Sequence, residues 1–413
     1  MFNLDIHLLH SIDKGKIKYK MIRSLSKIKF TKTMNIDTLC REYKYIHENC
    51  LFMTDTLKTL SLCDLTQKKD LYELIYYFKI NQSLKIKHLQ KNRNHQYPLF
   101  MQKQVISQNS RLVIIGDIHC DLKSLITILD TLKDKRWINN DFRLKSNINI
   151  IFLGDMVDYG YLGIEILFII LLLYYHNPKQ VFIINGNHDD VTYHKHHQFG
   201  KEKRQKLMSK EHKHIVHVLD EILNMIPCVL FLRFKNTKKY FQFCHGGVDQ
   251  HCMDLSYFLN SRINIIPVTY KMNEHLFIYP CHSHYNTTGF KWTDFNQKTE
   301  CINQNTSRSR GKKSTLIKIG PRCLETYLQN NNIYSIISGH QDRNVFQMIL
   351  NDKQKKNKKL MYNIRHQLYR FKSVTCNSTF QLDPTKDFLA CVTSTALNKG
   401  VKCTTFISLQ SKQ

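Results

Sequence analysis

The chain is short of acidic residues and of long apolar runs, and both shortages restrict what kind of protein it can be. Asp and Glu together number 33 against 61 Lys and Arg, which leaves a formal net charge of +28. The most apolar run, residues 161–175, contains Glu165 and is shorter than the roughly 20 residues that cross a bilayer as a helix. We therefore expect no membrane insertion, and we expect partners that are anionic.

Cysteine pairs of the metal-finger kind are also missing. The 13 cysteines include no Cys-x-x-Cys, so a zinc ribbon is not indicated. No clean apolar signal stretch begins the sequence, and we expect the thiols to be reduced, in the cytoplasm or the nucleus. With 413 residues and 42% apolar content, the chain can form one large α/β domain with an added segment.

The surplus of basic residues is spread widely, with runs at residues 14–32, 201–213 and 353–359. A solvated surface is the simplest explanation of such runs, and contact with nucleic acid is the alternative. No aromatic residues are interleaved with these runs in the manner of single-strand-binding proteins. Contact with RNA would therefore be electrostatic, without base reading, and sensitive to salt.

Five short segments place a possible metal ligand beside glycine or another turn residue. They are Gly-Asp-Ile-His at 116–119, Gly-Asp-Met-Val-Asp at 154–158, Gly-Asn-His-Asp at 186–189, His-Gly-Gly at 245–247 and Gly-His-Gln at 339–341. Each follows a β-branched or aromatic run that predicts a buried strand, and these runs cover residues 112–115, 148–153, 181–184, 240–243 and 333–337. Each ligand is expected at the carboxyl end of a strand, where glycine allows a tight turn.

The side chains in these segments are carboxylates, imidazoles and one amide carbonyl. Such a mixture suits Mn, Fe or Zn ions rather than an all-thiolate site. A single Gly-Asp-x-His segment is equally well explained as a turn. Five such segments in one order, each behind an apolar strand, instead predict a two-metal site.

These motifs resemble those of the calcineurin-like metallophosphoesterases, and more narrowly those of the phosphoprotein phosphatases that act on phosphoserine and phosphothreonine. Gly-Phe-Lys-Trp-Thr-Asp at 289–294 and Ser-Arg-Gly at 309–311 are similar to two further segments of that family. The resemblance spans most of residues 105–400. It implies an α/β fold in which a central β-sandwich is flanked by helices and carries a dinuclear metal site at the strand ends.

The last motif separates branches of that family. Related nucleases and phosphodiesterases typically have a second histidine two residues after the first, and both histidines bind metal. Here Gln341 and Asp342 follow His340, so only one imidazole is available. This arrangement is similar to the phosphatase branch.

The resemblance also implies a set of ligands for the two ions. Asp155 is expected to bridge them, since a carboxylate with two oxygens can hold cations about 3.5–4 Å apart. By similarity, Asp117 and His119 complete the protein ligands of the first ion, and Asn187, His245 and His340 complete those of the second.

The chemistry that follows is hydrolysis without a covalent phosphoenzyme. A hydroxide held between the two ions would be the nucleophile, because coordination lowers the pKa of a bound water towards about 7. His188 is expected to protonate the leaving oxygen, while Asp158 accepts the other ring proton and sets the tautomer. Arg310, with Arg308 as the alternative, is the guanidinium placed to clamp phosphate.

Three positions depart from the family pattern. Tyr159 stands where an arginine usually precedes glycine, Asn185 stands where an arginine is common, and Cys120 replaces a glycine. The expected function is that of a metal-dependent phosphomonoester hydrolase, a serine/threonine protein phosphatase with weakened phosphate binding. The alternatives are a small-molecule or dinucleoside-polyphosphate phosphatase, a nuclease or phosphodiesterase, and a non-catalytic binding protein on the same fold.

The chain is expected to divide near residue 100, into a basic, mainly helical segment (residues 1–100) and a catalytic domain (residues 101–413). The apolar run at residues 161–175 predicts a crossover helix with one face against the sheet. Helical spacing in the N-terminal segment predicts a helix over residues 70–79 that packs on the catalytic domain. The apolar residues at that spacing are Leu71, Leu74, Ile75 and Phe78.

Three histidines follow the third motif. His194, His196 and His197 lie among lysines, which favours an exposed helix face over a third metal site.

Overall fold

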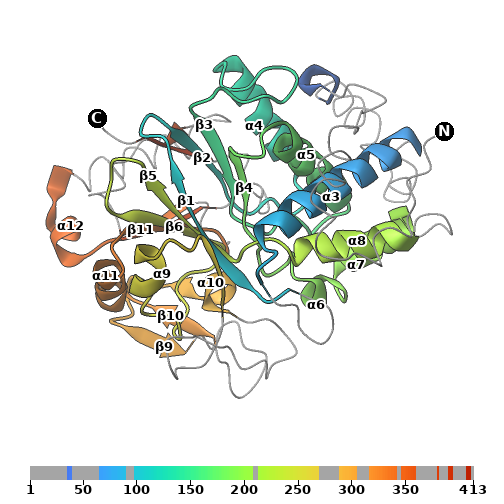
Figure 1. Ribbon diagram of the computed structural model, residues 1–413. Coiled ribbons are helices and arrows are strands. Elements are labelled where there is room, and N and C mark those ends of the chain that lie inside the picture. The colour runs from blue at the N-terminus through green and yellow to red at the C-terminus, as the bar shows by residue number, and fades with distance from the viewer. Residues whose placement is uncertain are drawn as a thin grey trace.

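The computed structural model has a mixed α/β architecture in which two large sheets lie between helices, as the resemblance implied (Figure 1). It describes residues 35–39, 65–89, 97–207, 213–268, 288–304, 316–341, 346–359, 379–380, 389–393 and 406–410.

A five-stranded sheet carries the first three motifs. Its strand order is β13-β15-β2-β3-β4, and β2, β3 and β4 run parallel. The strands are β2 (Arg111–Ile115), β3 (Ile148–Phe152), β4 (Val181–Ile183), β13 (Thr379–Phe380) and β15 (Phe406–Gln410). Every residue of β3 is buried, because helices cover one face of this sheet and the second sheet covers the other.

A seven-stranded sheet carries the last two motifs. Its strand order is β12-β14-β11-β6-β5-β1-β7, and β6 and β11 run parallel. The strands are β1 (Phe100–Ile106), β5 (Val229–Phe234), β6 (Tyr240–Cys244), β7 (Ile265–Pro267), β11 (Ile333–Ser338), β12 (Phe346–Ile349) and β14 (Ala390–Thr393). The carboxyl ends of β6 and β11 therefore lie at one edge of the sheet. All five predicted strands are present.

The two sheets pack face to face and bury one apolar cluster between them. Ile114 and Ile151 of the first sheet share this cluster with Leu230 and Phe243 of the second. Such packing of two inner faces is that of a β-sandwich, which confirms the predicted core.

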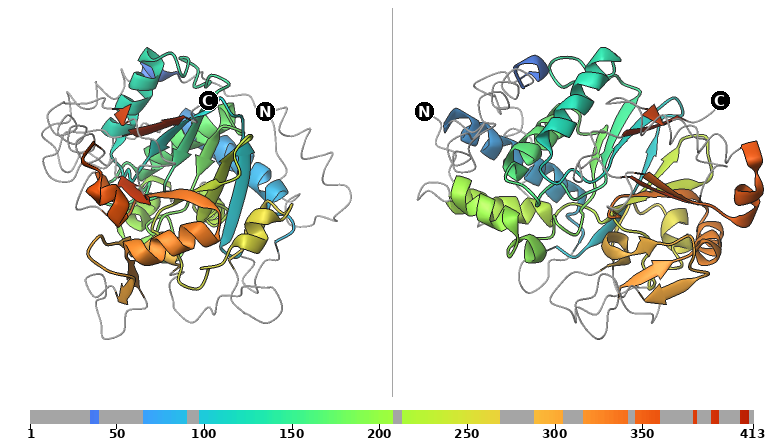
Figure 2. Two further views of the ribbon diagram at one scale, coloured as in Figure 1. Left: turned by 90° about the vertical axis from the view of Figure 1, so that its left-hand side faces the viewer. Right: turned by 180° about the vertical axis from the view of Figure 1, so that it is seen from behind.

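Helices cover both outer faces of the sandwich, as the views in Figures 1 and 2 show. On the five-stranded side lie α3 (Leu65–Lys85), α4 (Leu122–Asp134), α5 (Gly163–His176), α7 (Gln198–Leu207) and α8 (Lys213–Leu223). On the seven-stranded side lie α9 (Ser256–Asn260) and α11 (Pro321–Asn330). None of the helices that the structure describes is long and apolar enough to cross a membrane.

The N-terminal helix α3 explains why α5 is apolar nearly all round. The predicted crossover helix does face the sheet, but α3 packs on its other side. The rings of Tyr77 and Phe78 lie 6.4 and 4.9 Å from the ring of Tyr174 on α5, and Lys85 Nζ donates to the Tyr174 hydroxyl at 3.0 Å. The four residues predicted to form the apolar face of this helix are all buried: Leu71, Leu74, Ile75 and Phe78.

Smaller elements complete the described chain. They are α6 (Val191–His194), α10 (Gly289–Trp292), α12 (Asp352–Lys356) and a three-stranded sheet of β8 (Asp294–Phe295), β10 (Ile317–Ile319) and β9 (Ile302–Gln304). The structure joins Cys301 to Cys323 of α11 as a disulfide, with Cα atoms 4.8 Å apart. This pair departs from the expectation of reduced thiols, and a sequence separation of 22 residues gave no local signal for it. The cellular compartment stays a prediction.

We expect Phe78→Ala to lower the free energy of unfolding by about 3–5 kcal/mol, the usual cost of truncating a buried phenylalanine. The side chain is 1% exposed and fills the space between α3 and α5. Chemical denaturation followed by circular dichroism measures the change. Leu84→Ala is the matched control, because Leu84 lies on the same helix but is 37% exposed, and its loss should cost clearly less. Equal stability of Phe78→Ala and the wild type would contradict the packing of α3 on α5.

Candidate metal centre

The five motifs lie in loops at the ends of β2, β3, β4, β6 and β11, and four of their residues have a strained backbone. The φ angle is 44° at His119, 51° at Asp155, 68° at Asp158 and 72° at His340. A non-glycine residue in this left-handed region costs of order 1–3 kcal/mol and persists only where the surroundings enforce it. The strain falls on residues predicted to bind metal or to orient the acid, which supports a functional site.

Two motif glycines allow the loops to approach each other. A Cβ atom on Gly154, whose φ is +93°, would lie 2.5 Å from the backbone nitrogen of Gly186. A Cβ atom on Gly339 would lie 2.0 Å from Oδ1 of Asp117. Only glycine fits at these positions, so the second motif contacts the third directly and the fifth contacts the first.

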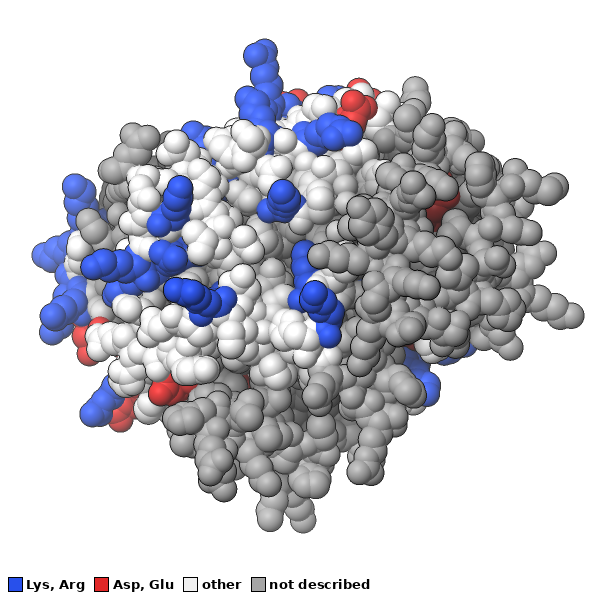
Figure 3. All heavy atoms as spheres, in the orientation of Figure 1, with Lys and Arg blue, Asp and Glu red and all other residues white. Residues whose placement is uncertain are grey.

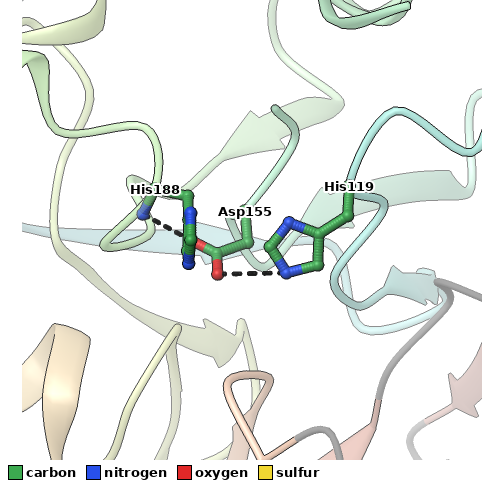
Figure 4. Close-up of side chains that lie close together, drawn as sticks. All are labelled: His119, Asp155 and His188. Carbon is green, nitrogen blue, oxygen red and sulfur yellow. Dashed lines mark hydrogen bonds and ion pairs between the residues drawn. The ribbon is translucent and has the colours of Figure 1, made fainter. Parts of the chain in front are cut away.

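Asp155 belongs to two groups of side chains that are close enough to hold an ion. One group contains His119 and His188, the other His245 and His340, and the possible ligand atoms within each group lie within 4.8 Å of one another. Figure 4 shows His119 and His188 on opposite sides of the carboxylate. The predicted central position of Asp155 therefore agrees with the geometry.

One carboxylate oxygen of Asp155 faces both groups. Oδ2 lies 3.5 Å from Nε2 of His119 and 3.0 Å from Nε2 of His245. Oδ1 instead accepts the backbone N–H of His188 at 2.9 Å. The sequence analysis considered both oxygens as ligands, whereas the backbone of the third motif already occupies one of them.

Backbone carbonyls orient two of the imidazoles. Nδ1 of His119 lies 3.0 Å from the carbonyl oxygen of Val157, and Nδ1 of His245 lies 3.1 Å from that of Leu153. A neutral ring in this setting carries its proton on Nδ1, and its Nε2 then presents a lone pair to Asp155.

The second group gathers further atoms that can donate a lone pair. Nε2 of His245 lies 2.9 Å from Oδ1 of Asn187 and 3.2 Å from Nδ1 of His340, and that Nδ1 lies 3.0 Å from the same Asn187 oxygen. Lone pairs that face one another at such distances repel unless a proton or a cation lies between them. Carboxylate, amide oxygen and imidazole donors fit Mn, Fe or Zn.

The charges around these atoms favour a positive charge at the same place. Burial by itself would lower the pKa of His245, but the carboxylates of Asp155 and Asp117 raise it to about 9. Burial would likewise raise the pKa of Asp155, but the imidazoles of His245 and His188 hold it well below its usual range. A metal ion would meet the same electrostatic demand and release the proton.

His188 has the partner that the sequence analysis predicted. Its Nδ1 donates to Oδ2 of Asp158 at 2.9 Å, and both side chains are buried. The other oxygen of Asp158 accepts the backbone N–H of Phe199 at 2.7 Å, which holds the carboxylate in place. Burial by itself would lower the pKa of His188, but the charges of Asp155 and Asp158 raise it above its ordinary value.

Asp117 lies at the site, between the first and the last motifs. It is fully buried, its two oxygens accept the backbone N–H of His340 at 3.1 and 3.0 Å, and Oδ1 lies 3.8 Å from Nδ1 of His245. Neither of the two ion-holding groups found among the described residues includes it. Its assignment as a ligand stays a prediction.

Asp189 ends the third motif, but the sequence analysis gave it no role. Its carboxylate accepts the backbone N–H groups of Gly186, Asp155 and Met156 at 2.9, 2.8 and 3.0 Å. Burial and the negative charge of Asp155 raise its pKa to about 6. The carboxylate thus joins the second motif to the third. Its position directly after Asn-His in a buried loop was the one feature of the sequence that pointed to this role.

Aromatic side chains surround the imidazoles. The ring of Tyr159 lies 4.7 Å from that of His119 and 4.9 Å from that of His188. The ring of Tyr193 lies 4.7 Å from that of His188 and stacks on His197 at 4.2 Å and 11°. The contact of Tyr159 with His188 joins two different loops, so no local pattern could predict it, whereas the contacts of Tyr193 lie within the segment that follows the third motif.

The segment containing Trp292 reaches the site from the seven-stranded side. Its indole lies 5.6 Å from the rings of His340 and Tyr193. The neighbouring Lys291 is buried and donates to Asp190 at 3.1 Å, which ties this segment to the loop after the third motif.

Gln341, which follows the last histidine, has a structural role in this arrangement. Its Oε1 accepts the backbone N–H of Phe295 at 2.7 Å, and its Nε2 donates to the Phe295 carbonyl at 3.0 Å. Arg310 and Arg308 lie outside the described residues, so the phosphate clamp stays a prediction.

One of the three histidines after the third motif was wrongly expected on an exposed face. His194 is fully buried, and its Nε2 lies 2.9 Å from Lys203 Nζ and 3.3 Å from Asp220 Oδ1. His196 and His197 are exposed, as expected. The packing of α7 and α8 buries His194, and a local pattern of lysines could not show this.

The comparison with protein families agrees with this geometry. A profile described as calcineurin-like phosphoesterase matches residues 110–343, which is more than half of the chain. The chain belongs to the calcineurin-like phosphoesterase family. All five motifs of this phosphoesterase lie within the matched region.

The phosphoesterase is similar over part of its length to known protein phosphatases. It is 26% identical over 236 residues to serine/threonine-protein phosphatase rdgC of Drosophila melanogaster, covering 56% of this chain and 32% of that protein. It is 28% identical over 160 residues to serine/threonine-protein phosphatase PP2A-like PPG1 of Candida albicans, covering 38% of this chain and 34% of that protein. The matches thus span about a third of the length of these relatives.

Among solved structures, a protein serine/threonine phosphatase from Saccharomyces cerevisiae aligns with a TM-score of 0.49 at 15% identity, covering 86% of this chain and 83% of that chain.

Proposed function

We propose that this phosphoesterase hydrolyses phosphomonoesters, with phosphoserine and phosphothreonine in proteins as its substrates. The observation that carries the proposal is that two groups of possible ligands share Asp155, and that His188, a member of one of them, is held by Asp158 through its Nδ1. The partial similarity to serine/threonine-protein phosphatases supports the choice of substrate.

The site's own residues would hold two ions and the phosphoryl group between them. Bound ions would polarise the phosphoryl oxygens and lower the pKa of a water. The side chains proposed to hold them are Asp117, His119, Asp155, Asn187, His245 and His340. Mn, Fe and Zn all suit this donor set, and Arg310 is proposed to grip the phosphate.

His188 would provide the proton that the leaving oxygen needs. Asp158 accepts the Nδ1 proton, so the transferable proton of the charged ring is the one on Nε2. The backbone N–H of His188 is fixed on Asp155, which keeps the ring beside the ligand groups.

We expect the Mn-loaded protein to hydrolyse phosphoserine and phosphothreonine peptides and aryl phosphomonoesters much faster than bis-aryl diesters or single-stranded RNA. In the described part of the face shown in Figure 3, Lys and Arg are dispersed and Asp and Glu are few. RNA is therefore expected to bind without being cut, and its affinity should fall by about tenfold or more between 50 and 200 mM salt as counterions are released. Monoester hydrolysis should change much less over the same series.

Hydrolysis rates and RNA binding would be measured in one preparation across the salt series, with Asp155→Asn as the control for contaminating enzymes. Faster cleavage of RNA or of the diester by the wild type alone would overturn the proposal. Full binding of metal without hydrolysis of any phosphoester would favour a non-catalytic binding protein.

A further inference from the structure

An aromatic rim borders the ring of His188, the residue proposed to protonate the leaving oxygen. We use this name for Tyr159, Tyr193, His197 and Trp292. Tyr159 and Tyr193 both contact the ring of His188, at 4.9 and 4.7 Å between centroids. His197 stacks on Tyr193 at 4.2 Å, and Trp292 lies 5.6 Å from Tyr193. The proton donor is thus bordered by aromatic side chains from several loops.

Tyr159 is the most exposed member of the rim and has an unusual backbone. Its side chain is 67% exposed, and its φ of 59° lies in the left-handed region that a large residue rarely adopts. Holding a tyrosine in this conformation costs free energy and leaves a large apolar surface in water. A ligand that covers the ring would offset this cost.

We infer that the site also accepts phosphotyrosine in proteins, and that Tyr159 favours it by contact with the aryl leaving group. The inference rests on the proposed phosphomonoesterase activity. In phosphotyrosine the ring is bonded directly to the leaving oxygen, so a ring on the oxygen that His188 protonates lies at the rim. Aromatic rings pair in tilted or edge-on arrangements with centroids 4.5–7 Å apart. The rings of Tyr159 and Tyr193 already lie at such distances from the ring of His188, and Trp292 lies at such a distance from Tyr193.

Other phosphomonoesters fit the rim less well. Phosphoserine and phosphothreonine place only small aliphatic groups beside the leaving oxygen, so they leave the ring of Tyr159 uncovered. In a nucleotide the base is separated from the phosphorus by the ribose, so its ring begins several bonds farther away. An aromatic surface that starts beside the proton donor is suited to an aryl phosphate.

The reaction balances as a hydrolysis. The bond between phosphorus and the phenolic oxygen breaks, and an oxygen from water forms the new bond to phosphorus. His188 gives its Nε2 proton to the phenolic oxygen, and a proton from the attacking water restores the charged ring in the next step. The products are tyrosine and inorganic phosphate.

The test compares two peptides of one sequence that carry either phosphotyrosine or phosphoserine at the same position. For the Mn-loaded full chain we expect hydrolysis of both peptides. Tyr159→Ala should lower kcat/KM for both, but the loss should be roughly 2- to 12-fold larger for the phosphotyrosine peptide. This factor corresponds to the free energy of one aromatic pair. Tyr159→Phe keeps the ring and should retain the wild-type ratio. Tyr257→Ala removes an equally exposed tyrosine from α9 and should also leave the ratio unchanged.

Two results would overturn the inference and leave the proposed function standing. One is hydrolysis of phosphoserine without phosphotyrosine, and the other is an equal effect of Tyr159→Ala on both peptides. Faster hydrolysis of a nucleoside monophosphate than of both peptides would also overturn it. If no phosphoester is hydrolysed, the proposed function fails, and the contact with Tyr159 is tested instead by the binding of non-hydrolysable phosphonate peptides. Tighter binding of the aryl phosphonate by the wild type, lost in Tyr159→Ala, would support the contact. Equal binding of the aryl and alkyl phosphonates would contradict it.

Discussion

Asp155→Asn is expected to abolish turnover and to lower the metal content by at least one ion per chain. One oxygen of Asp155 faces both His119 and His245, so both proposed ion positions depend on this single carboxylate. The amide is neutral and offers a weaker donor to two cations that are close together. Metal analysis of the purified variant and phosphopeptide hydrolysis measure the two effects.

Asp254→Asn is the matched control, because it makes the same chemical change in an exposed residue, whose carboxylate accepts the backbone N–H of Ser256 at 2.9 Å. It should retain both metals and full activity. Because Oδ1 of Asp155 also accepts the N–H of His188, folding of the Asp155 variant should be checked by thermal denaturation. Full metal content together with full activity in Asp155→Asn would rule out the assignment of Asp155 as the bridging ligand.

His188→Ala is expected to slow hydrolysis by a factor of roughly 10²–10⁴, the usual scale of general acid–base catalysis. Both metals should stay bound. The imidazole is fixed through Nδ1 by Asp158 and lies beside Asp155. The loss should be largest for phosphoserine peptides, whose alkoxide leaves poorly without a proton. It should be smaller for nitrophenyl phosphate, whose leaving group is stable as an anion.

The dependence on the leaving group separates an acid from a metal ligand, and His188 also lies close enough to His119 and Asp155 to bind an ion. Loss of metal in His188→Ala, with an equal rate loss for both leaving groups, would assign it as a ligand instead. His251→Ala, an exposed histidine outside the motifs, is the control and should change neither quantity.

Local order in the sequence was enough to predict the strands that carry the five motifs. Each apolar run before a motif formed a strand of the sandwich, because a β-branched run bounded by glycine has few other buried conformations. The His188–Asp158 pair could also be anticipated, since both residues lie in loops at the ends of adjacent parallel strands. The helical spacing of Leu71 and Phe78 predicted the apolar face of α3 for the same kind of local reason.

Contacts between distant segments required the tertiary structure. The sequence showed Asp155 as a bridging candidate, but only the fold places a single oxygen between two imidazoles and gives the other to the backbone of His188. The carboxylate of Asp189 likewise joins two different loops, because it accepts a backbone N–H from each. Periodicity describes one segment at a time, whereas these hydrogen bonds depend on how loops from separate strands pack.

The same distinction applies to the substrate side of the site. Tyr159 is recognisable from the sequence only as a residue in place of an arginine, and its contact with the rings of His119 and His188 follows from the left-handed turn that carries it. The covering of α5 by α3 and the pairing of Cys301 with Cys323 were hidden for the same reason. Residue types and short-range spacing determine the chemistry that is available, and long-range packing determines which of these groups meet.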